Sequence, residues 1–463
     1  MAIAPGTATQ TPLDRTLTER GLGLVNGKTT DMADSVLRVP LHYYRDPKIT
    51  EIEESAILRR TPLVIVPSSQ IPQSHDYVVR SVLGDSLLIT RDARGRAHVF
   101  LNYCRHRGAM PACGSGNSRR FVCPYHAWNY DTEGKLVRIP GKEGFAEIDP
   151  DSYGLVELPN EERFGFVWAV LTAGADIDLD SHLGGFAAEL DQWTYSGYGY
   201  HDHREFVSET SWKGALEAFA EGYHFPFVHG QSVIGQNTVA NTHVYDEWGR
   251  HHRIGFPFNN IADLNDNPSE DWDPILRMGV IYWIYPNLIL ANSPVGVEVI
   301  DILPAGSPTT CTVRHSWMAR YPATDDAQRA FYEEIYNQVH AAVRDEDFVM
   351  LPQCGEGVRH GQHDHMLIGR NEIGVQHMSG CWRPNSVSPW TDAGSRVSSC
   401  AVPRQRPRAS RRSSTPGSGC GSPSAARLPG STPRGWPTAP AWSTRHRIFR
   451  SRRGFQRSRA PRR

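Results

Sequence analysis

The segment from residue 102 to 130 reads NYCRHRGAMPACGSGNSRRFVCPYHAWNY. It contains Cys104-x-His106 and Cys123-x-x-His126, with sixteen residues between the two pairs. Two thiolates and two imidazoles in two short loops predict a four-ligand metal site. Such a set could hold a structural zinc ion in a tetrahedron. It could also hold a [2Fe–2S] cluster in which two Cys bind one iron and two His bind the other.

The arrangement of the two pairs favours the cluster over zinc. Zinc fingers usually place both Cys in one loop and both His in the other. Here each loop offers one Cys and one His, so each loop can reach both irons. Gly108 and Pro124 flank the pairs, where tight loops need unusual backbone angles.

The motif Cys-x-His-Arg-Gly, followed by Cys-Pro-Tyr-His-Ala-Trp, resembles the Rieske domain of bacterial ring-hydroxylating oxygenases. This resemblance implies that the two Cys–His pairs bind a [2Fe–2S] cluster. Respiratory Rieske domains carry an extra Cys in each loop, and these two Cys form a disulfide. The matching positions here are Ala109 and Tyr125, and Cys113 matches neither. The resemblance therefore implies a cluster of the lower-potential oxygenase or ferredoxin type.

Composition narrows the class of protein. A length of 463 residues allows two or three domains. No apolar run of about eighteen residues is present, so no membrane span is expected. Residues 1–20 lack an apolar core after a basic segment, which predicts no secretory signal. Eight Cys in a chain of this length do not indicate a disulfide framework, and a cytoplasmic protein is expected.

Residues 393–463 differ from the rest of the chain. They hold 17 Arg, 13 Ser and 9 Pro but no Lys, Asp or Glu, so residues 1–392 carry 32 of the 49 basic residues against all 50 acidic ones. Such a tail cannot bury enough apolar surface to fold. It is either an arginine-rich segment for nucleic acids or anionic surfaces, or an out-of-frame translation of GC-rich DNA, which we favour. The authentic domain would then end near Trp382, and loss of the last helix would inactivate the chain.

Residues 61–172 alternate short apolar runs with Gly, Asp, Ser and Pro. This pattern predicts a small antiparallel β domain with the metal loops at its tips, where a rigid sheet can present an exposed redox centre. The expected strands are residues 63–66, 77–79, 87–89, 98–101 and a closing strand at 162–170, with hairpin turns at 92–95 and 131–134.

Residues 173–385 predict an α+β domain in which a helix lies across an antiparallel sheet, in a helix-grip-like catalytic fold. Residues 1–60 would pack with this domain, and residues 386–463 form the tail. Thr324 is expected to cap the long amphipathic helix, and apolar residues repeat along it from Phe331 through Ile335 and Val339 to Val343. The expected elements are helices at 212–228 and 324–349 and strands within 278–304 and 311–318.

A second group of metal-binding residue types lies in residues 211–230, which read SWKGALEAFAEGYHFPFVHG. In one unbroken helix, His224 and His229 would point about 140° apart. We therefore expect Pro226 to break the helix and bring them together. Glu221 precedes His224 by three residues and would share its face. Two His and one carboxylate with open coordination positions form the site of non-haem Fe(II) oxygenases.

The third iron ligand must come from elsewhere in the chain. The acidic residues 345–347 supply candidates. Asp347, which is followed by Phe-Val-Met-Leu-Pro-Gln353, best resembles the terminal Asp segment of ring-hydroxylating oxygenases, and a solvated helix face is the alternative. Asn371 and Glu372 would line or brace the substrate pocket, with a purely structural role as the alternative. The remaining His residues singled out are expected to be surface or hydrogen-bonding groups, namely His251, His252, His363 and His365.

Residues 40–382 as a whole resemble the large (alpha) subunit of a Rieske-type aromatic-ring-hydroxylating oxygenase. Trp212-Lys213, Glu217 and Tyr223-His224 match the iron-site motif of that family. Two positions depart from it. The family often has Asn where this chain has Ala218. Ring-dihydroxylating members commonly have Asp where this chain has Glu221, and a Glu is more familiar in demethylases and in enzymes acting on quaternary amines.

The resemblance implies a terminal oxygenase with two metal centres. Electrons from NAD(P)H would pass through a separate reductase, in some members with a ferredoxin, to the cluster and then to Fe(II), where O2 reacts with a small organic substrate. The cluster ligands would be Cys104, His106, Cys123 and His126, and the iron ligands His224, His229 and Asp347.

The resemblance also implies a homotrimer, in some members with a beta subunit, in which the cluster of one subunit reduces the iron of its neighbour. The carboxylate at Glu221 would carry that link, and direct ligation of the iron by Glu221 is the alternative. The expected reaction is ring dihydroxylation in aromatic hydrocarbon catabolism, with monooxygenation or demethylation of a quaternary amine or methoxy compound as the alternative. A Rieske electron carrier without catalysis and a zinc-stabilised structural protein are the other function classes. No membrane or nucleic-acid partner is expected.

Overall fold

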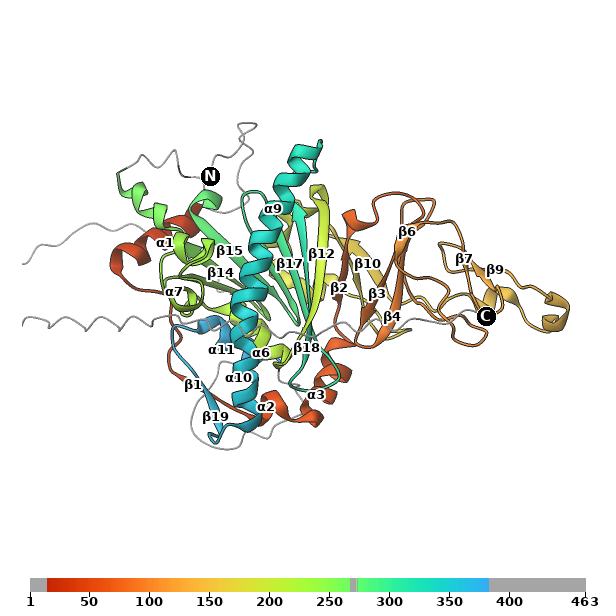
Figure 1. Ribbon diagram of the computed structural model, residues 1–463, viewed down its shortest axis with the longest axis horizontal. Helices are drawn as coiled ribbons and strands as arrows, with labels where there is room; N and C mark the ends of the chain where they lie inside the picture. The colour runs from red at the N-terminus through yellow and green to blue at the C-terminus, as the bar shows by residue number, and fades with distance from the viewer. Residues whose placement is uncertain (1–14, 267–271, 273, 383–463) are drawn as a thin grey trace, which may run out of the picture. The chain divides into compact units, whose positions relative to one another are not determined.

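The computed structural model describes residues 15–266, 272 and 274–382 (Figure 1). These residues all belong to the first of two units of the chain, Met1–Arg404. The hypothesis about the basic tail concerns residues outside the described part. No helix in the described part is long and apolar enough to cross a membrane.

Three small antiparallel sheets form the part of the chain that contains the Cys–His loops. Their strand orders are β5-β4-β3-β6, β7-β8-β9 and β10-β11-β2. The predicted turns at residues 92–95 and 131–134 are confirmed, since Gly95 and Gly134 adopt the left-handed φ angles of 85° and 75° that a tight turn requires. The strands are β2 (Leu63–Pro67), β3 (Asp76–Val82), β4 (Asp85–Arg91), β5 (Ala97–Leu101), β6 (Ser115–Asn117), β7 (Phe121–Val122), β8 (Asn129–Tyr130), β9 (Leu136–Arg138), β10 (Asn160–Arg163) and β11 (Phe166–Ala169).

The single closing strand expected at residues 162–170 is wrong. The segment forms a hairpin of β10 and β11, turning at Phe164 and Gly165, which both have positive φ angles of 54° and 77°. A Cβ atom on Gly165 would lie 2.5 Å from the backbone of Tyr195, so the turn needs glycine at this position. β11 then pairs with β2 and closes the sheet.

A seven-stranded antiparallel sheet forms the core of the following part of the chain, in the order β12-β18-β17-β16-β15-β14-β13. The helix made of α9 and α10 lies across one face of this sheet (Figure 1), which confirms the predicted α+β class. The strands are β12 (Gly199–Ser208), β13 (Val244–Trp248), β14 (His251–Pro257), β15 (Met278–Ile284), β16 (Leu288–Asn292), β17 (Gly296–Pro304) and β18 (Cys311–Ala319). The helical elements are α6 (Trp212–Glu217), α9 (Asp326–Ala342), the π-helical η11 (Val343–Asp347), α10 (Phe348–His360) and α11 (Ile373–Cys381).

The face that α9 turns to the sheet agrees with the predicted one at Ile335, Val339 and Val343, which are half-buried or buried, and differs from it at Phe331. Phe331 is 44% exposed, whereas Tyr332 and Tyr336 are buried. The ring of Tyr332 packs 5.3 Å from that of Trp317 on β18, and the hydroxyl of Tyr336 donates to a backbone carbonyl of the same strand over 2.6 Å. Aromatic packing against β18 therefore decides the orientation. The prediction that Thr324 caps the helix is wrong. Asp325 caps it instead, because its side chain accepts from the backbone N–H of Gln328.

The N-terminal segment packs against the seven-stranded sheet through α1 and contributes a strand to a separate two-stranded sheet. Helix α1 contacts β13 and β14, and β1 pairs antiparallel with β19. The predicted boundaries at residues 60, 172 and 385 stay a prediction. The elements of this layer are α1 (Arg15–Gly27), β1 (Leu37–Pro40), α2 (His42–Arg45), α3 (Pro47–Glu53), the π-helical η1 (Glu54–Leu58) and β19 (His365–Ile368).

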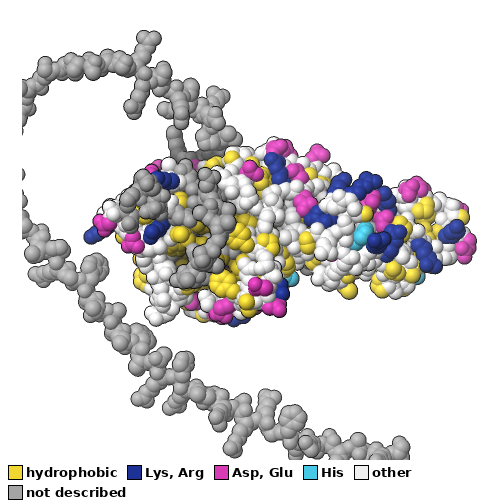
Figure 2. Space-filling model, turned by 90° about the horizontal axis from the view of Figure 1, so that it is seen from above, with side chains coloured by type: hydrophobic (Ala, Val, Ile, Leu, Met, Phe, Trp, Pro, Cys, Tyr) yellow, Lys and Arg dark blue, Asp and Glu magenta, His cyan; other side chains and the backbone are white. Residues whose placement is uncertain are grey.

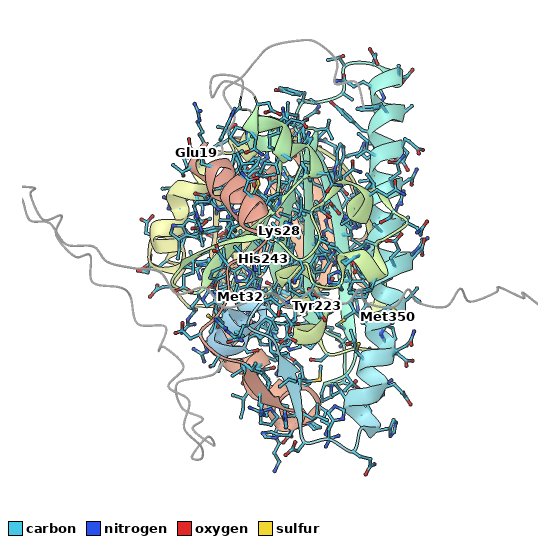
Figure 3. The ribbon with its side chains drawn as sticks, turned by 90° about the vertical axis from the view of Figure 1, so that its left-hand side faces the viewer. Glu19, Lys28, Met32, Tyr223, His243 and Met350 are labelled. Atoms are coloured by element: carbon cyan, nitrogen blue, oxygen red, sulfur yellow. The ribbon has the colours of Figure 1, made fainter. Side chains whose placement is uncertain are left out.

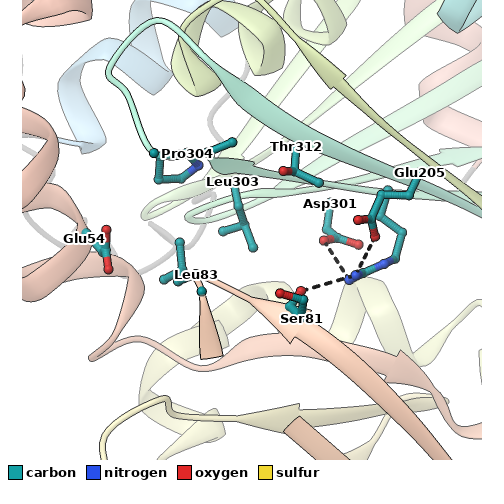
Figure 4. A pocket seen from close by; sticks show the side chains of 12 residues that line it. Glu54, Ser81, Leu83, Glu205, Asp301, Leu303, Pro304 and Thr312 are labelled. Atoms are coloured by element: carbon teal, nitrogen blue, oxygen red, sulfur yellow. Dashed lines mark hydrogen bonds and ion pairs between the residues drawn. The ribbon is translucent and has the colours of Figure 1, made fainter. Parts of the chain in front are cut away.

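A cavity of about 360 Å³ lies between the β3–β4 hairpin and the strands β12, β17 and β18 (Figure 4). Its main charged group is Arg314, which pairs with Glu205 over 2.8 Å and with Asp301 over 3.5 Å. Burial raises the pKa of Asp301. The arginine is thus engaged by two carboxylates, and the cavity contains none of the predicted metal ligands.

A buried ion pair joins α6 to α3. The Lys213 ammonium donates to Glu53 over 2.5 Å, both side chains are 1% exposed, and the Trp212 indole donates to the second Glu53 oxygen over 3.2 Å. Burial raises the pKa of Glu53 and lowers that of Lys213, so each charge depends on the other. This pair fixes the start of the segment that leads to His224.

We predict that Lys213→Met lowers the free energy of unfolding by about 3–5 kcal/mol, because it leaves the Glu53 carboxylate buried and unpaired. Denaturant unfolding followed by circular dichroism would measure the loss. The double variant with Glu53→Leu should recover most of it, since no charge is then buried. A single variant as stable as the parent would contradict this account of the pair.

Candidate metal centres

The two Cys–His loops are closed by their own backbone. The Gly108 N–H donates to the Cys104 carbonyl, and the Ala127 N–H donates to the Cys123 carbonyl, each over 2.9 Å. Gly108 and Ala127 both have positive φ angles, 77° and 54°. The two loops therefore have the same turn, and each turn fixes its cysteine without help from distant parts of the chain.

The four predicted ligands of this centre converge. The thiols of Cys104 and Cys123 are buried and close enough to interact, and burial raises the pKa of the Cys104 thiol. The rings of His106 and His126 lie 4.4 Å apart between centroids. The Nδ1 atoms of both histidines are buried, and neither has a hydrogen-bond partner among the described residues. The Trp128 ring stacks on His106 at 5.1 Å and holds its orientation.

This donor set fits a metal centre with two sulfur and two nitrogen ligands. Buried nitrogens without partners are costly unless a ligand satisfies them. The Tyr130 hydroxyl lies 3.2 Å from the Cys104 sulfur, as hydrogen-bonding groups beside metal-bound sulfur do. The donors alone suit either zinc or a [2Fe–2S] cluster, so the choice rests on the comparisons below.

The two histidines of the second group lie on an irregular segment, whereas the sequence predicted a helix over residues 212–228. Helix α6 is followed by one 3-10 turn, η7 (Ala218–Ala220), and the chain becomes extended at Glu221, with φ −155° and ψ 163°. The break thus comes at Glu221 and not at Pro226. Pro226 lies in the first turn of the short helix α7 (Phe225–Val228), where a missing N–H costs nothing.

The Glu221 carboxylate explains the position of this break. It accepts hydrogen bonds from the backbone N–H groups of Tyr223 and His224, which a continuous helix would have used internally. Gly222 allows the bend to approach the sheet, since a Cβ atom there would lie 2.8 Å from the Phe256 ring. The turn of α7 then places His229 opposite His224.

Three predicted iron ligands form a compact triangle. The Nε2 atoms of His224 and His229 are 3.3 Å apart, and Asp347 Oδ1 lies 3.4 Å from the first and 3.0 Å from the second. Ligand atoms about 2.1 Å from one ion are separated by roughly 3 Å. In the part of the chain that the structure describes, this is the one group of three or more His, Cys, Asp or Glu residues whose ligand atoms all lie within 4.8 Å of one another, as binding to a single ion requires.

The electrostatics of the triangle favour a cation. Burial lowers the pKa of His224, but hydrogen bonds to Asp347 and Glu221 outweigh it and raise the pKa to about 10. Burial raises the pKa of Asp347, and the two histidines outweigh that effect and lower it. The carboxylates thus stabilise positive charge at this point, which fits a divalent metal ion.

Each histidine of the triangle has a carboxylate at its other ring nitrogen. Glu221 contacts Nδ1 of His224, on the side away from the triangle, so the structure does not bring it to the position of a direct iron ligand. Glu346 Oε2 lies 2.6 Å from Nδ1 of His229. From the sequence, Glu346 was considered only as one of several possible third iron ligands, and its contact with His229 was not predicted.

The structure also shows the surroundings of Glu372 and of three histidines outside the triangle, namely His243, His251 and His252. Glu372 accepts from the Gly369 N–H, and burial and the charge of Glu221 raise the pKa of its carboxyl. His243 had no distinguishing pattern, yet it is fully buried close to Glu221, and both ring nitrogens lack partners among the described residues (Figure 3). His251 and His252 are buried hydrogen-bonding groups and not surface residues.

Both centres lie beside exposed apolar side chains. Tyr125, next to His126, is 58% exposed, and Phe227, two residues before His229, is 78% exposed. Figure 2 shows hydrophobic side chains gathered on one face and Lys and Arg side chains over the part that carries β7 and β9. Around the cluster loops the exposed residues include Arg105, Arg107, Met110, Arg119, Arg120 and Val122, and around the histidine segment they include Tyr223, Val233, Val349 and Met350.

Family models match both regions that hold these residues. The model of the Rieske [2Fe-2S] domain matches residues 61–149. The model of the ring hydroxylating alpha subunit (catalytic domain) matches residues 190–385.

Similar proteins include oxygenases of several kinds. The carnitine monooxygenase oxygenase subunit of Acinetobacter baumannii is 30% identical over 69% of this chain and 85% of that protein. The N,N-dimethyl phenylurea N-demethylase subunit alpha of Sphingobium sp. (strain YBL2) is 33% identical, and this chain spans 43% of its length. The anthranilate 1,2-dioxygenase large subunit of Acinetobacter baylyi is 29% identical over 42% of this chain and 43% of that protein.

The fold has solved counterparts. The structure of a quaternary ammonium Rieske monooxygenase superposes with a TM-score of 0.64 at 20% identity and covers 81% of this chain and 98% of that one. The family models and the relative matched over 85% of its length exclude the zinc-stabilised structural protein. The chain belongs to the Rieske non-haem iron oxygenases as an oxygenase alpha subunit, a family whose members carry a [2Fe–2S] cluster and a mononuclear iron.

Proposed function

We propose that this chain is a terminal oxygenase whose iron centre is the triangle of His224, His229 and Asp347. The observation that carries the proposal is the convergence of three ligand atoms within 3.4 Å of one another, each from a buried or half-buried side chain. The cluster would be held by the four converging side chains of Cys104, His106, Cys123 and His126.

When bound, the two centres supply one-electron transfer and O2 activation, with electrons from NAD(P)H arriving through a separate reductase. Glu221 and Glu346 each accept from Nδ1 of a histidine, which leaves the Nε2 lone pair free for the metal. Three protein ligands leave coordination positions open for small molecules. The Phe225 ring packs against His224 at 4.9 Å and His229 at 5.6 Å and keeps water from that side of the triangle.

Electron transfer between copies of the chain, in a homotrimer, is part of the proposal. Support comes from the exposed apolar residues beside each centre, such as Tyr125 and Phe227, which one copy could cover on the next. Glu221 would connect His224 of one copy to the cluster of another. The exposed arginines around the cluster loops suit an acidic reductase or ferredoxin. None of the six described cysteines forms a disulfide, which agrees with the proposed cytoplasmic location.

We propose a cationic N-methyl or quaternary amine as the substrate class, with oxygenation of a carbon next to nitrogen. Asp347 belongs to the triangle, Glu221 and Glu346 contact its two histidines, and the Glu372 carboxyl lies close enough to interact with the charge of Glu221. Carboxylates beside the aromatic rings of Phe225 and Phe256 suit a cation. The similarity to carnitine monooxygenase agrees with this class.

Ring dihydroxylation, the reaction first expected from the resemblance, stays the second candidate. The similarity to the anthranilate 1,2-dioxygenase large subunit favours it. The hypothesis that the tail is out of frame also stays a prediction. It agrees with the end of the catalytic-domain match at residue 385, shortly before the acidic residues cease.

We predict that anaerobically purified protein contains about three irons and two sulfides per chain. His224→Ala should remove one iron and keep the EPR signal of the reduced cluster, whereas Cys123→Ser should remove the signal. Metal analysis and EPR spectroscopy would measure both. Zinc in place of iron, or His224→Ala with full iron content, would contradict the assignment.

We predict that Glu221→Gln lowers turnover by about 10–100-fold while both centres keep their metals. The amide keeps the shape of the side chain and removes the charge that would link the two centres. Stopped-flow absorbance would follow reoxidation of the reduced cluster by O2 with substrate present. Reoxidation at the parental rate with normal metal content would rule out this role for Glu221.

We predict that N-methylated quaternary amines stimulate O2 uptake and give an oxidised or demethylated product, whereas an aromatic hydrocarbon gives no cis-diol. Incubation with reductase, NADH and each compound, followed by mass spectrometry, would distinguish the reactions. The His224→Ala variant serves as the matched control. Formation of a cis-diol would favour the second candidate.

A further inference from the structure

Two consecutive residues hold His229 at its two ring nitrogens. Asp347 Oδ1 lies 3.0 Å from Nε2, and Glu346 Oε2 lies 2.6 Å from Nδ1. The imidazole is 1% exposed, so water does not compete for either nitrogen. Glu346 is 117 residues from His229 in the chain and reaches it from another element.

A π-helical turn brings both carboxylates to the same ring. Residues Val343–Asp347 are π-helical between α9 and α10. Along an α-helix, successive side chains point about 100° apart, which tends to send neighbours to different surroundings. Single π-helical turns inside α-helices occur frequently at functional sites. Here the turn lies where Glu346 and Asp347 must both face one histidine.

We propose that Glu346 is a positioning residue for the iron centre. By accepting from Nδ1–H of His229, it fixes the tautomer that presents the Nε2 lone pair, and it makes that nitrogen a stronger donor. It also joins the irregular histidine segment to the helix that carries Asp347. This inference rests on the proposed assignment of His229 and Asp347 as iron ligands.

The roles of Glu346 and Glu221 differ, although both contact an Nδ1 atom. Glu221 also accepts from two backbone N–H groups of its own segment, so it stabilises the local bend. The bond to His229 is the one side-chain hydrogen bond that Glu346 makes within the described residues. Its side chain is 27% exposed, so a role in holding His229 explains its orientation better than a role in the core.

The neighbouring residue Asp345 provides a matched control. It lies in the same π-helical turn, pairs with Arg344 over 2.6 Å, and its side chain is 52% exposed. Asp345→Asn therefore changes the charge of the same turn without touching His229.

The test compares Glu346→Ala, Glu346→Gln and Asp345→Asn in the full-length protein with its cluster intact. Competition with a chromophoric chelator measures the dissociation constant for Fe(II). We expect Glu346→Ala to raise that constant about 10–100-fold. Glu346→Gln keeps an oxygen acceptor and should raise it less, and Asp345→Asn should leave it unchanged. EPR of the reduced cluster should be the same in all variants.

A second readout separates positioning from a merely structural effect. At saturating Fe(II), the EPR spectrum of the nitric oxide complex should shift in Glu346→Gln and not in Asp345→Asn, because the histidine has lost its charged partner. Parental Fe(II) affinity and an unshifted spectrum in Glu346→Gln would overturn the proposal, even if Glu346→Ala failed to fold. Absence of Fe(II) binding by the parent protein would instead refute the proposed function.

Discussion

Three polar ligand atoms lie within 3.4 Å of one another around His224, His229 and Asp347. Bringing such groups together without a cation costs desolvation energy, and the surrounding structure must hold them in place. The segment that carries the histidines has little regular secondary structure between η7 and α7. Its geometry therefore depends on side-chain contacts, and several of these come from distant parts of the chain.

These contacts form a continuous series. The buried Lys213–Glu53 pair fixes α6 against α3, at the start of the histidine segment. The Glu221 carboxylate then stabilises the bend through two backbone N–H groups. Glu346 fixes the far end of the segment at His229. Each contact is charged and at least partly shielded from water, where a hydrogen bond to an ion is worth more than a neutral one.

The two metal centres differ in how much of their structure is local, and this decides what the sequence could predict. The cluster loops close through hydrogen bonds between residues that are close in sequence, such as Gly108 and Cys104. The short sequence motif was therefore sufficient to predict all four cluster ligands. The proposed ligand Asp347 was predicted only because its segment resembles a family pattern. The break at Glu221, the tyrosine face of α9 and the Glu346 contact depend on tertiary partners such as Trp317 and His229, which no local pattern contains. Strands made of a short apolar run between turn residues, such as residues 63–66 and 87–89, were predicted well. The β10–β11 hairpin was missed because two positive φ angles turn the chain within an apolar run.

The charges around the proposed iron centre are the structural feature that favours a cationic substrate in our proposal. A divalent ion with two neutral imidazoles and the carboxylates of Asp347, Glu221 and Glu346 has a net charge of −1. Burial and the charge of Glu221 raise the pKa of Glu372, whose carboxyl supplies a further polar oxygen. In the proposed substrate site, an apolar hydrocarbon would leave that negative charge without compensation, whereas a quaternary ammonium group would offset it. The Glu side chain at position 221 is one carbon longer than the Asp that is common in ring-dihydroxylating members. Its carboxylate accepts from two backbone N–H groups and contacts Nδ1 of His224 at the same time.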